Sequence, residues 1–252
     1  MLKARIIPTL LYRDFGLVKG IRFDPNRAVG SPMQAIKVYN LRGVDELIFL
    51  DITATLQGRR PEFALIDDLA DECFMPLTVG GGVRSVEDVR GLLEVGADKV
   101  AVNTAAVEYP ELVQEGADRF GSQCIVVSID TKIGSDGRNT VWTRSGTQPT
   151  GRDPVELAVE VAEHGAGEIL LTSIDRDGTM DGYDLAMIRE ITQAVSIPVI
   201  ASGGAGNYEH MARAILDGES SAVAAASMFH FTEQTPREAK VYLREQNIPV
   251  RL

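Results

Sequence analysis

The sequence predicts an α/β fold of the (β/α)8 barrel type, also called a TIM barrel, and three observations support this class. Eight short apolar runs alternate with eight helix-like segments along the 252 residues, which is the usual length and pattern of such a barrel. The runs are almost continuously apolar, as expected for parallel strands that are buried on both faces. The two halves of the chain also repeat at an offset of about 120 residues. A doubly wound sheet is the alternative, but it does not explain this repeat.

The first half of the predicted barrel covers about residues 1–120. It opens with a buried strand over 5–11 and a long polar loop over 12–30, and loops of that size are usually functional. Ser31 is the expected N-cap of the first helix, and Gly43 is the residue just past its end. The other elements predicted in this half are strands at 46–51, 77–79 and 99–102 and helices at 61–72, 84–95 and 110–119.

The second half covers about residues 121–252 and opens with a strand over 124–129. A polar insertion over 131–151 contains two turn signals, Asp136-Gly137 and Ser145-Gly146, and we expect a small hairpin between them. Asp153 is the expected N-cap of the next helix. The other elements predicted in this half are strands at 168–172, 198–201 and 222–226 and helices at 154–164, 185–194, 207–217 and 236–246. The two halves together are expected to form a single domain, 1–252.

Glycine-rich loops follow two of the predicted strands, at 80–82 and at 203–206. Glycines let the backbone approach a ligand closely, and the helix that follows directs free N–H groups and its positive dipole end toward the same place. Each loop alone could be only a tight turn between a strand and a helix. Because the loop is repeated in both halves, we expect two phosphate sites on opposite sides of one mouth, and therefore a ligand with a phosphate at each end.

In this fold the chemistry takes place at the C-terminal ends of the strands. Asp130 is the best candidate for a general acid or base, because burial at the end of an apolar strand moves the pKa of a carboxyl group toward neutrality. Asp51 is the second candidate, and it could instead hold a ligand group or orient its neighbours. For each of them a helix cap or a loop hydrogen bond is the alternative. The strand ends in question are Leu11, Asp51, Asn103, Asp130, Thr172 and Ser202.

Charged residues of alternating sign begin four of the strands, at the opposite end of the barrel. They are Arg5, Glu46, Lys99 and Glu168. At that end the default interpretation is a ring of ion pairs that stabilises the fold. The more specific interpretation is a gate over a passage through the barrel.

Composition excludes several classes of function. The formal net charge is −11, and binding a nucleic acid needs a basic face, so no nucleic-acid partner is expected. No apolar run reaches the length that spans a membrane, and the N-terminal residues carry no signal-peptide pattern. We therefore expect a cytoplasmic protein.

The cysteines and histidines give no sign of a metal site. Cys73 and Cys124 are isolated from each other and are expected to be buried free thiols. The three histidines are widely spaced and form no metal-binding motif. No metal and no cofactor are expected.

Long segments of the chain resemble the cyclase subunit of imidazole glycerol phosphate synthase, over essentially the whole length. The matching segments are RIIP at 5–8, DELIFLDITA at 45–54, TVGGGV at 78–83, GADKVAVNTAAVE at 96–108, FGSQ at 120–123, GAGEILLTSIDRDGT at 165–179, GYD at 182–184 and IASGGAG at 200–206. The resemblance implies a barrel that docks a glutaminase subunit at the end where the strands begin. Ammonia would then pass through the barrel and close an imidazole ring on a phosphorylated nucleotide at the other end.

The resemblance also assigns roles to single residues. It implies that the four charged residues at the strand starts form the ammonia gate, that Lys19 belongs to a mobile first loop, and that Asp130 is one of two catalytic aspartates. The residues that it places at the two phosphates are Gly82, Asn103 and Thr104 at one end and Asp177, Gly178, Gly203, Gly204, Ala226 and Ser227 at the other.

The second catalytic aspartate of that family falls at Leu11, where this chain reads Thr9-Leu10-Leu11-Tyr12. A paralogous branch, associated with the amidation of nucleotide sugars for surface polysaccharides, resembles the chain at this place and at 72–77. We therefore predict a synthase subunit that relays ammonia, with a glutaminase and a sugar amidotransferase as partners. The alternative is an authentic ring-closing lyase of histidine biosynthesis in which Asp14 or a water replaces the missing acid. A barrel isomerase of the neighbouring pathway step is a third interpretation, but it would also need an acid near position 11.

Overall fold

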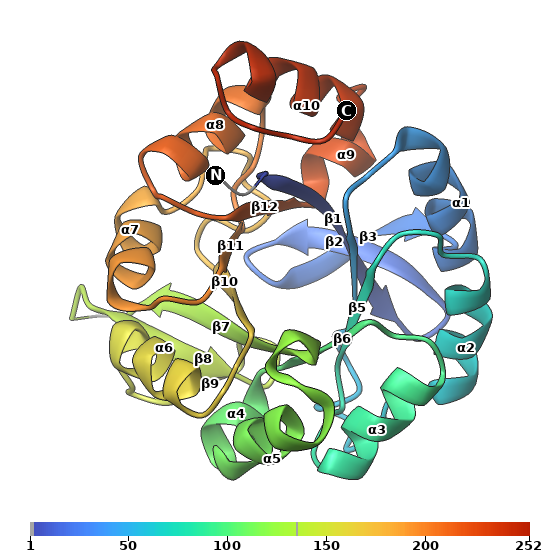
Figure 1. The fold of residues 1–252 in the computed structure, drawn as a ribbon, viewed down its shortest axis with the longest axis vertical. Helices are drawn as coiled ribbons and strands as arrows, with labels where there is room; N and C mark the ends of the chain where they lie inside the picture. The colour runs from blue at the N-terminus through green and yellow to red at the C-terminus, as the bar shows by residue number, and fades with distance from the viewer. Residues whose placement is uncertain (1–2, 135) are drawn as a thin grey trace.

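Eight parallel strands close into a barrel in the computed structural model, which describes residues 3–134 and 136–252 (Figure 1). Each strand pairs with the next in parallel, and the last pairs with the first, so the sheet has no open edge in the barrel. The barrel strands are β1 (Arg5–Arg13), β4 (Leu47–Asp51), β5 (Leu77–Gly80), β6 (Lys99–Val102), β7 (Ile125–Ile133), β10 (Glu168–Ser173), β11 (Val199–Ser202) and β12 (Ala222–Ala225). The predicted fold class is confirmed. Residues 1, 2 and 135, in the predicted N-terminal segment and insertion, lie outside the described residues.

Helices surround this barrel, and each follows one of the barrel strands in the chain (Figure 1). They are α1 (Pro32–Arg42), α2 (Phe63–Asp71), α3 (Val86–Glu94), α5 (Glu111–Phe120), α6 (Pro154–Glu163), α7 (Leu185–Ala194), α8 (Tyr208–Leu216) and α10 (Pro236–Glu245). A short 3-10 turn, η1 (Ser122–Cys124), precedes β7. Within the described residues, no helix has the length and apolar character needed to cross a membrane.

The predicted helix ends are largely confirmed. The Asp153 carboxylate accepts hydrogen bonds from the backbone N–H of Val155 and Glu156, at 2.8 and 3.1 Å. Gly43 adopts the left-handed conformation just past α1, with φ of 60°, as glycine commonly does at this place. Ser31 precedes α1 as predicted, but its side chain makes no capping hydrogen bond.

The segment 12–30 is not a loop, and this part of the prediction is wrong. Strand β1 continues to Arg13, and β2 (Gly16–Ile21) and β3 (Asp24–Gly30) form an antiparallel hairpin beside it. The turn of this hairpin uses Arg22 and Phe23 with φ of 55° and 62°. Glycine, asparagine and aspartate are the usual residues in such a turn, so the sequence carried no hairpin signal here.

The predicted hairpin in the insertion is confirmed. Strand β8 (Asn139–Thr143) pairs antiparallel with β7 and with the short β9 (Gln148–Pro149). The two halves of the barrel thus share a feature, because β1 and β7 each continue into an antiparallel hairpin. They share a second one, since a five-residue helix follows the fourth barrel strand of each half: α4 (Thr104–Glu108) and α9 (Ser227–Phe231). Neither short helix was predicted. The division into half-barrels stays a prediction that these correspondences support.

Two apolar clusters stabilise the fold. The larger one fills the space between the strands and the outer helices. The smaller one lies inside the barrel and includes Ala101, Ala222 and Ala224 among larger residues such as Leu170. Burial of this apolar surface is the main stabilising term for such a fold.

The cysteines are free, as predicted, but both are half-buried and not fully buried. Burial raises the pKa of the Cys73 thiol, and the nearby Met75 carbonyl group opposes this shift.

Candidate functional site

Four charged side chains form a closed ring at the end where the barrel strands begin. Arg5 donates to Glu46 at 2.7 Å and also to Glu168. Lys99 donates to the second oxygen of Glu46 at 3.0 Å and to the second oxygen of Glu168 at 2.8 Å. Each carboxylate therefore contacts both cations, and the contacts predicted from the alternating charges are present. Burial alone would lower the pKa of Arg5, but hydrogen bonds and charges from Glu168 and Glu46 outweigh burial and raise it.

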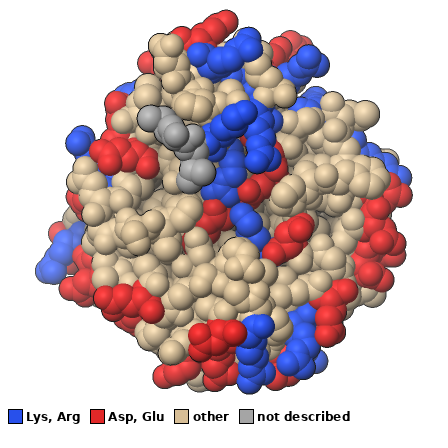
Figure 2. Space-filling view, in the orientation of Figure 1, with Lys and Arg blue, Asp and Glu red and all other residues tan. Residues whose placement is uncertain are grey.

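The surface around this ring is largely uncharged. Figure 2 shows this face of the barrel: charged atoms gather at the centre and at the outer edge, with an uncharged belt between them that Lys and Arg atoms interrupt toward the top of the view. Leu41 and Phe74, from the two connections on either side of β4, are 90% and 83% exposed. Exposed apolar residues on a face with few charges are typical of a protein contact surface.

A cavity of about 580 Å³ opens at the other end of the barrel, where the strands finish. Its lining includes every residue that the sequence placed at this mouth. These are Leu11, Lys19, Asp51, Gly82, Asn103, Thr104, Asp130, Thr172, Asp177, Gly178, Ser202, Gly203, Gly204, Ala226 and Ser227. The structure therefore brings the residues of both glycine loops into one cavity, as the repeat predicts.

The cavity reaches deep into the barrel. Its lining includes Ala101 and Leu170, which follow the ring residues Lys99 and Glu168 by two positions on the same strands. Side chains two positions apart on a strand lie on the same face, so these residues form the layer directly above the ring. This apolar layer lies between the floor of the cavity and the ring.

Asp130 lies on β7 at the mouth and is held by two polar neighbours. Ser128 donates from its hydroxyl group to one carboxylate oxygen at 3.2 Å, and Asn103 donates to the other at 3.3 Å. Burial raises the pKa of Asp130 to about 7; the Ser128 hydrogen bond opposes this shift and the charge of Asp177 adds to it. A carboxyl group with such a pKa can donate or accept a proton at neutral pH. This agrees with the role predicted for Asp130, which stays a prediction.

The raised pKa of Asp130 predicts a pH-dependent stability. The folded chain binds this proton more tightly than the unfolded chain, whose aspartate has a pKa near 3.8. Stability should therefore fall as the pH rises from about 4 to about 7, by up to about 4 kcal/mol for this group. Asp130→Asn removes the ionisable group. The free energy of unfolding of this variant, relative to that of the wild type, should therefore increase across that pH range and then level off. Urea unfolding between pH 4.5 and 8 measures this, and a difference that does not change with pH would contradict it.

The Asp51 carboxylate is held by contacts with the loop that follows it in the chain. One carboxylate oxygen accepts from the backbone N–H groups of Thr53 and Ala54, at 2.9 and 3.0 Å. The other oxygen contacts the Arg59 guanidinium at 3.2 Å. These contacts favour the orienting role over direct catalysis, and the catalytic role of Asp51 stays an untested prediction.

Leu11 faces the cavity from β1, so an apolar side chain occupies the place of the second expected acid. Asp14 lies in the turn between β1 and β2 with φ of 58°, and its carboxylate is near Arg13 at 3.9 Å. Asp14 is not among the residues that line the cavity. The structure therefore does not bring Asp14 to the place where it would substitute for the missing acid.

Lys19 is on β2, not on a free loop, and its side chain is only 2% exposed. Its ammonium group donates to Asp177 at 2.5 Å. The lysine and the predicted phosphate residue Asp177 thus form a buried ion pair at the edge of the cavity, and together they place one positive and one negative charge there.

The glycines of both loops are required by close packing of the backbone. Gly81 and Gly204 have φ of 106° and 111°. A Cβ atom on Gly81 would lie 2.2 Å from the Asp51 carbonyl oxygen, and one on Gly204 would lie 2.2 Å from the Gly182 carbonyl oxygen. The tight-turn interpretation is therefore correct, and the phosphate sites expected at the same loops stay a prediction.

Gly204→Ala should destabilise the fold by about 2–4 kcal/mol, because it combines a strained backbone with a clash against a carbonyl group. Urea unfolding measures the loss. Gly58→Ala is a matched control: Gly58 also has positive φ, at 65°, but a Cβ atom there meets nothing within 4 Å, so only about 1 kcal/mol of strain is expected. Equal losses in the two variants would contradict the packing argument.

Free backbone donors remain at the side of the mouth formed by the second half of the chain. In the part of the chain that the structure describes, the N–H groups of Gly178, Gly204 and Ser227 have no acceptor. All three residues line the cavity, and Ser227 begins α9. At the first loop, the Gly82 N–H instead donates to the Thr55 hydroxyl group at 3.3 Å.

Sequence reasoning missed several residues of the mouth, among them Thr9, Arg144 and Ser145. Arg144 and Ser145 lie in the turn between β8 and β9 with φ of 53° and 55°. The Ser145 hydroxyl group donates to the Ile52 carbonyl oxygen at 2.6 Å, which fixes this turn over the cavity. The sequence predicted a turn at this place, but it did not show that the turn folds over the cavity.

Comparison with known proteins identifies the family. The family described as "Histidine biosynthesis protein" matches residues 5–235. Two curated relatives, both named imidazole glycerol phosphate synthase subunit HisF and both from Caulobacter vibrioides (strains NA1000 / CB15N and ATCC 19089 / CIP 103742 / CB 15), are 54% identical over 253 residues; the alignments cover 100% of this chain and 97% of each relative. This chain belongs to the HisF family.

HisF-family membership confirms the resemblance seen in the sequence segments. The paralogous branch associated with sugar amidation is a finer assignment, which the HisF relatives do not bear on, and it stays a prediction. Within the described residues, no group of three or more His, Cys, Asp and Glu side chains is arranged to hold a metal ion.

Proposed function

We propose that this HisF-family chain is the synthase subunit of a glutamine amidotransferase complex. A glutaminase subunit binds the face with the ion-pair ring, and ammonia passes through the barrel to a phosphorylated ligand at the mouth. The observation that carries this proposal is the alignment of three parts along one barrel: the ring, one apolar layer, and the cavity. The relatives are named as subunits of a synthase, which supports the partner.

The ring suits a gate, because each of its two carboxylates contacts both of its cations and so closes the ring. Ammonia is neutral and small, so the apolar layer with Ala101 and Ala224 is not an electrostatic barrier to it. The closed ring would have to open, by moving a side chain such as Lys99, when the partner delivers ammonia. The uncharged belt around the ring supports the docking of that partner on the same face (Figure 2).

Ring closure, as in histidine biosynthesis, is the finer reaction that the names of the relatives support. The two glycine loops, the free N–H groups of the second loop and the raised pKa of Asp130 also fit a cyclase with a ligand that carries two phosphates. The full length of the chain aligns with these relatives.

Ammonia relay to a separate sugar amidotransferase is the second candidate, and one specific observation favours it. Leu11 lines the mouth where a second acid is expected, and Asp14 does not replace it. Neither relative's name mentions sugar amidation, so this candidate depends on position 11 and on the resemblance at 72–77. Among the candidates, the geometry of the mouth favours a subunit that uses ammonia but closes the imidazole ring slowly.

The deciding experiment is turnover of the bis-phosphate aminoimidazole nucleotide with free ammonia, measured beside a HisF relative from Caulobacter vibrioides. We expect turnover more than about tenfold below that of the relative, a difference of about 1.4 kcal/mol in barrier height. Turnover within tenfold would establish ring closure and remove the relay candidate.

A further inference from the structure

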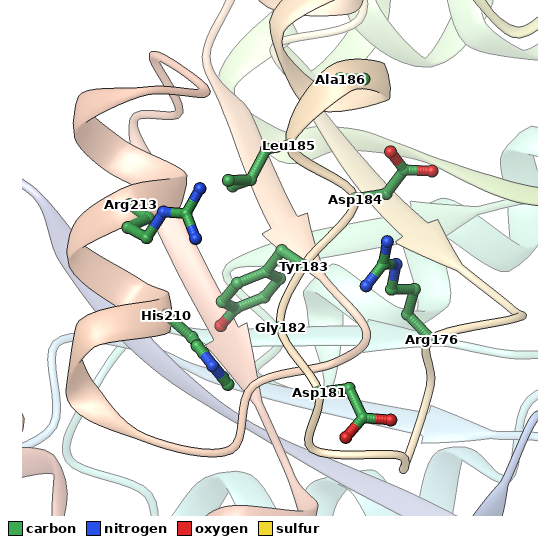
Figure 3. A pocket seen from close by; sticks show the side chains of 9 residues that line it. All are labelled: Arg176, Asp181, Gly182, Tyr183, Asp184, Leu185, Ala186, His210 and Arg213. Carbon is green, nitrogen blue, oxygen red and sulfur yellow. The ribbon is translucent and has the colours of Figure 1, made fainter.

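A second cavity, of about 290 Å³, lies outside the barrel between the start of α7 and the side of α8 (Figure 3). Its lining includes Gly182, His210, Arg213 and Arg176. In Figure 3, His210 and Arg213 project from α8 toward the segment 181–186, and the Arg176 guanidinium lies on the other side of that segment, near Asp184. Nothing in the proposed ammonia path uses this cavity.

The corresponding place in the first half of the barrel has the same backbone arrangement. Asp88 on α3 accepts a hydrogen bond from the Arg84 N–H at 3.0 Å. His210 on α8, about 120 residues later, accepts one from the Gly206 N–H at 3.2 Å. The two helices also have equivalent N-caps, since Ser85 accepts from Asp88 N–H and Asn207 accepts from His210 N–H.

One side chain distinguishes the two places. In the first half, Arg60 reaches Asp88 with a distance of 2.7 Å between its Nε and the carboxylate oxygen. Gly182 follows Arg60 by the same number of residues as His210 follows Asp88, so Gly182 is the equivalent residue in the second half. A Cβ atom built on Gly182 would lie 3.6 Å from the His210 ring, so the glycine faces the imidazole as Arg60 faces Asp88. The cavity therefore occupies the space that an arginine fills in the first half.

The charges at the two places are reversed. The first half pairs a cation with the carboxylate of Asp88. In the second half, His210 replaces that carboxylate. Its Nδ1 lies 3.2 Å from the Gly206 N–H, and its Nε2 lies 3.3 Å from the side-chain nitrogen of Asn207. Arg213, one turn further along α8, lies on the same face as His210, and among the described residues its ion-pair partner is the exposed Asp217, at 3.2 Å. An ion pair between exposed side chains contributes little to stability, so the guanidinium group of Arg213 is available to bind another anion.

The acidic residues of the lining are directed elsewhere. Asp184 caps α7, because its carboxylate accepts from the Met187 N–H at 3.2 Å. The Asp181 carboxylate points away from both guanidinium groups in Figure 3. The ion pair of Arg213 is with Asp217, which does not line the cavity, and not with either of these carboxylates. The edge of the cavity formed by His210 and Arg213 therefore carries a positive charge.

We propose that this cavity binds a small dianion, of the class of inorganic phosphate or the phosphate group of a metabolite, through Arg213 and His210. The site is separate from the mouth but is connected to it. Gly182 donates to the Gly204 carbonyl oxygen at 2.8 Å, and His210 holds Gly206, so the second glycine loop of the mouth rests on two residues of the cavity.

Inorganic phosphate is the probe for this site. It is titrated into the full chain at pH 7.5 and constant ionic strength, and the NMR signals of the Gly206 amide and the His210 imidazole nitrogens are followed. We expect the signals of both residues to shift with the same saturating dependence on phosphate concentration. Arg213→Gln should weaken the binding that these signals report about tenfold, because it removes a charge-assisted hydrogen bond. Arg237→Gln, the loss of an exposed arginine on α10, should leave it unchanged.

The Gly178 amide reports on the mouth in the same titration and separates this proposal from the proposed function. Crystals soaked in tungstate, a phosphate-shaped anion, should show a peak between His210 and Arg213. If Gly206 and His210 do not respond while Gly178 saturates, or if Arg213→Gln and Arg237→Gln bind alike, the second site does not exist. Ammonia transfer through the barrel would be unaffected by that result.

Discussion

Leu11→Asp is expected to raise the rate of ring closure with free ammonia by about 10²–10⁴-fold, the usual contribution of one general acid or base. Leu11 pairs with Leu50 of β4, and both residues line the cavity. Asp130 lies on β7, away from both strands in the order of the barrel. An aspartate at position 11 would therefore give the mouth an acid from each half of the repeat. The measurement is steady-state turnover of the bis-phosphate nucleotide with ammonium chloride.

Two controls make this gain specific. Leu11→Asn has the same shape as the aspartate but cannot transfer a proton, so it should remain as slow as the wild type. Leu11→Asp combined with Asp130→Asn should lose the gain, because both acids are then needed. If Leu11→Asp does not change turnover, position 11 does not limit the reaction and the relay candidate loses the observation on which it depends.

The barrel itself could be predicted from the sequence because its signals are local. Buried parallel strands are apolar runs, and helix ends such as Asp153 and Gly43 carry their own residue preferences. The four ring residues were also predictable, since each begins a strand and strand starts meet at one end of a barrel. The pairing of each carboxylate with both cations follows once the barrel closes.

The parts that could not be predicted depend on distant contacts. The β2–β3 hairpin turns at Arg22 and Phe23, which are not turn-forming residues. Lys19 was expected on a mobile loop because its partner Asp177 lies far away in the chain. The short helices α4 and α9 contain too few residues for a periodic pattern. The cavity beside α8 exists because a side chain is absent at Gly182, and no residue pattern reports an empty space.

Lys99→Met tests the ring, and it should strongly destabilise the fold. It removes one cation and leaves Glu46 and Glu168 each with a single partner in a largely buried place. Breaking a buried ion pair in this way destabilises proteins by about 3–5 kcal/mol, and the partial exposure of Lys99, 18%, puts the expected loss at roughly 3 kcal/mol. Urea unfolding measures it.

If the ring is a gate for ammonia, Lys99→Met should also change the yield of product from glutamine. With the glutaminase partner bound, product formed from glutamine should fall at least about fivefold more than product formed from ammonium chloride, because only the first route passes the ring. Lys240→Met is the matched control. Lys240 forms a buried pair with Asp45 at 2.8 Å, at the same end of the barrel but outside the ring, so it should lose similar stability and keep the ratio of the two products. If both variants lower the ratio equally, the ring only stabilises the fold, and ammonia must reach the mouth by a path that does not cross Lys99.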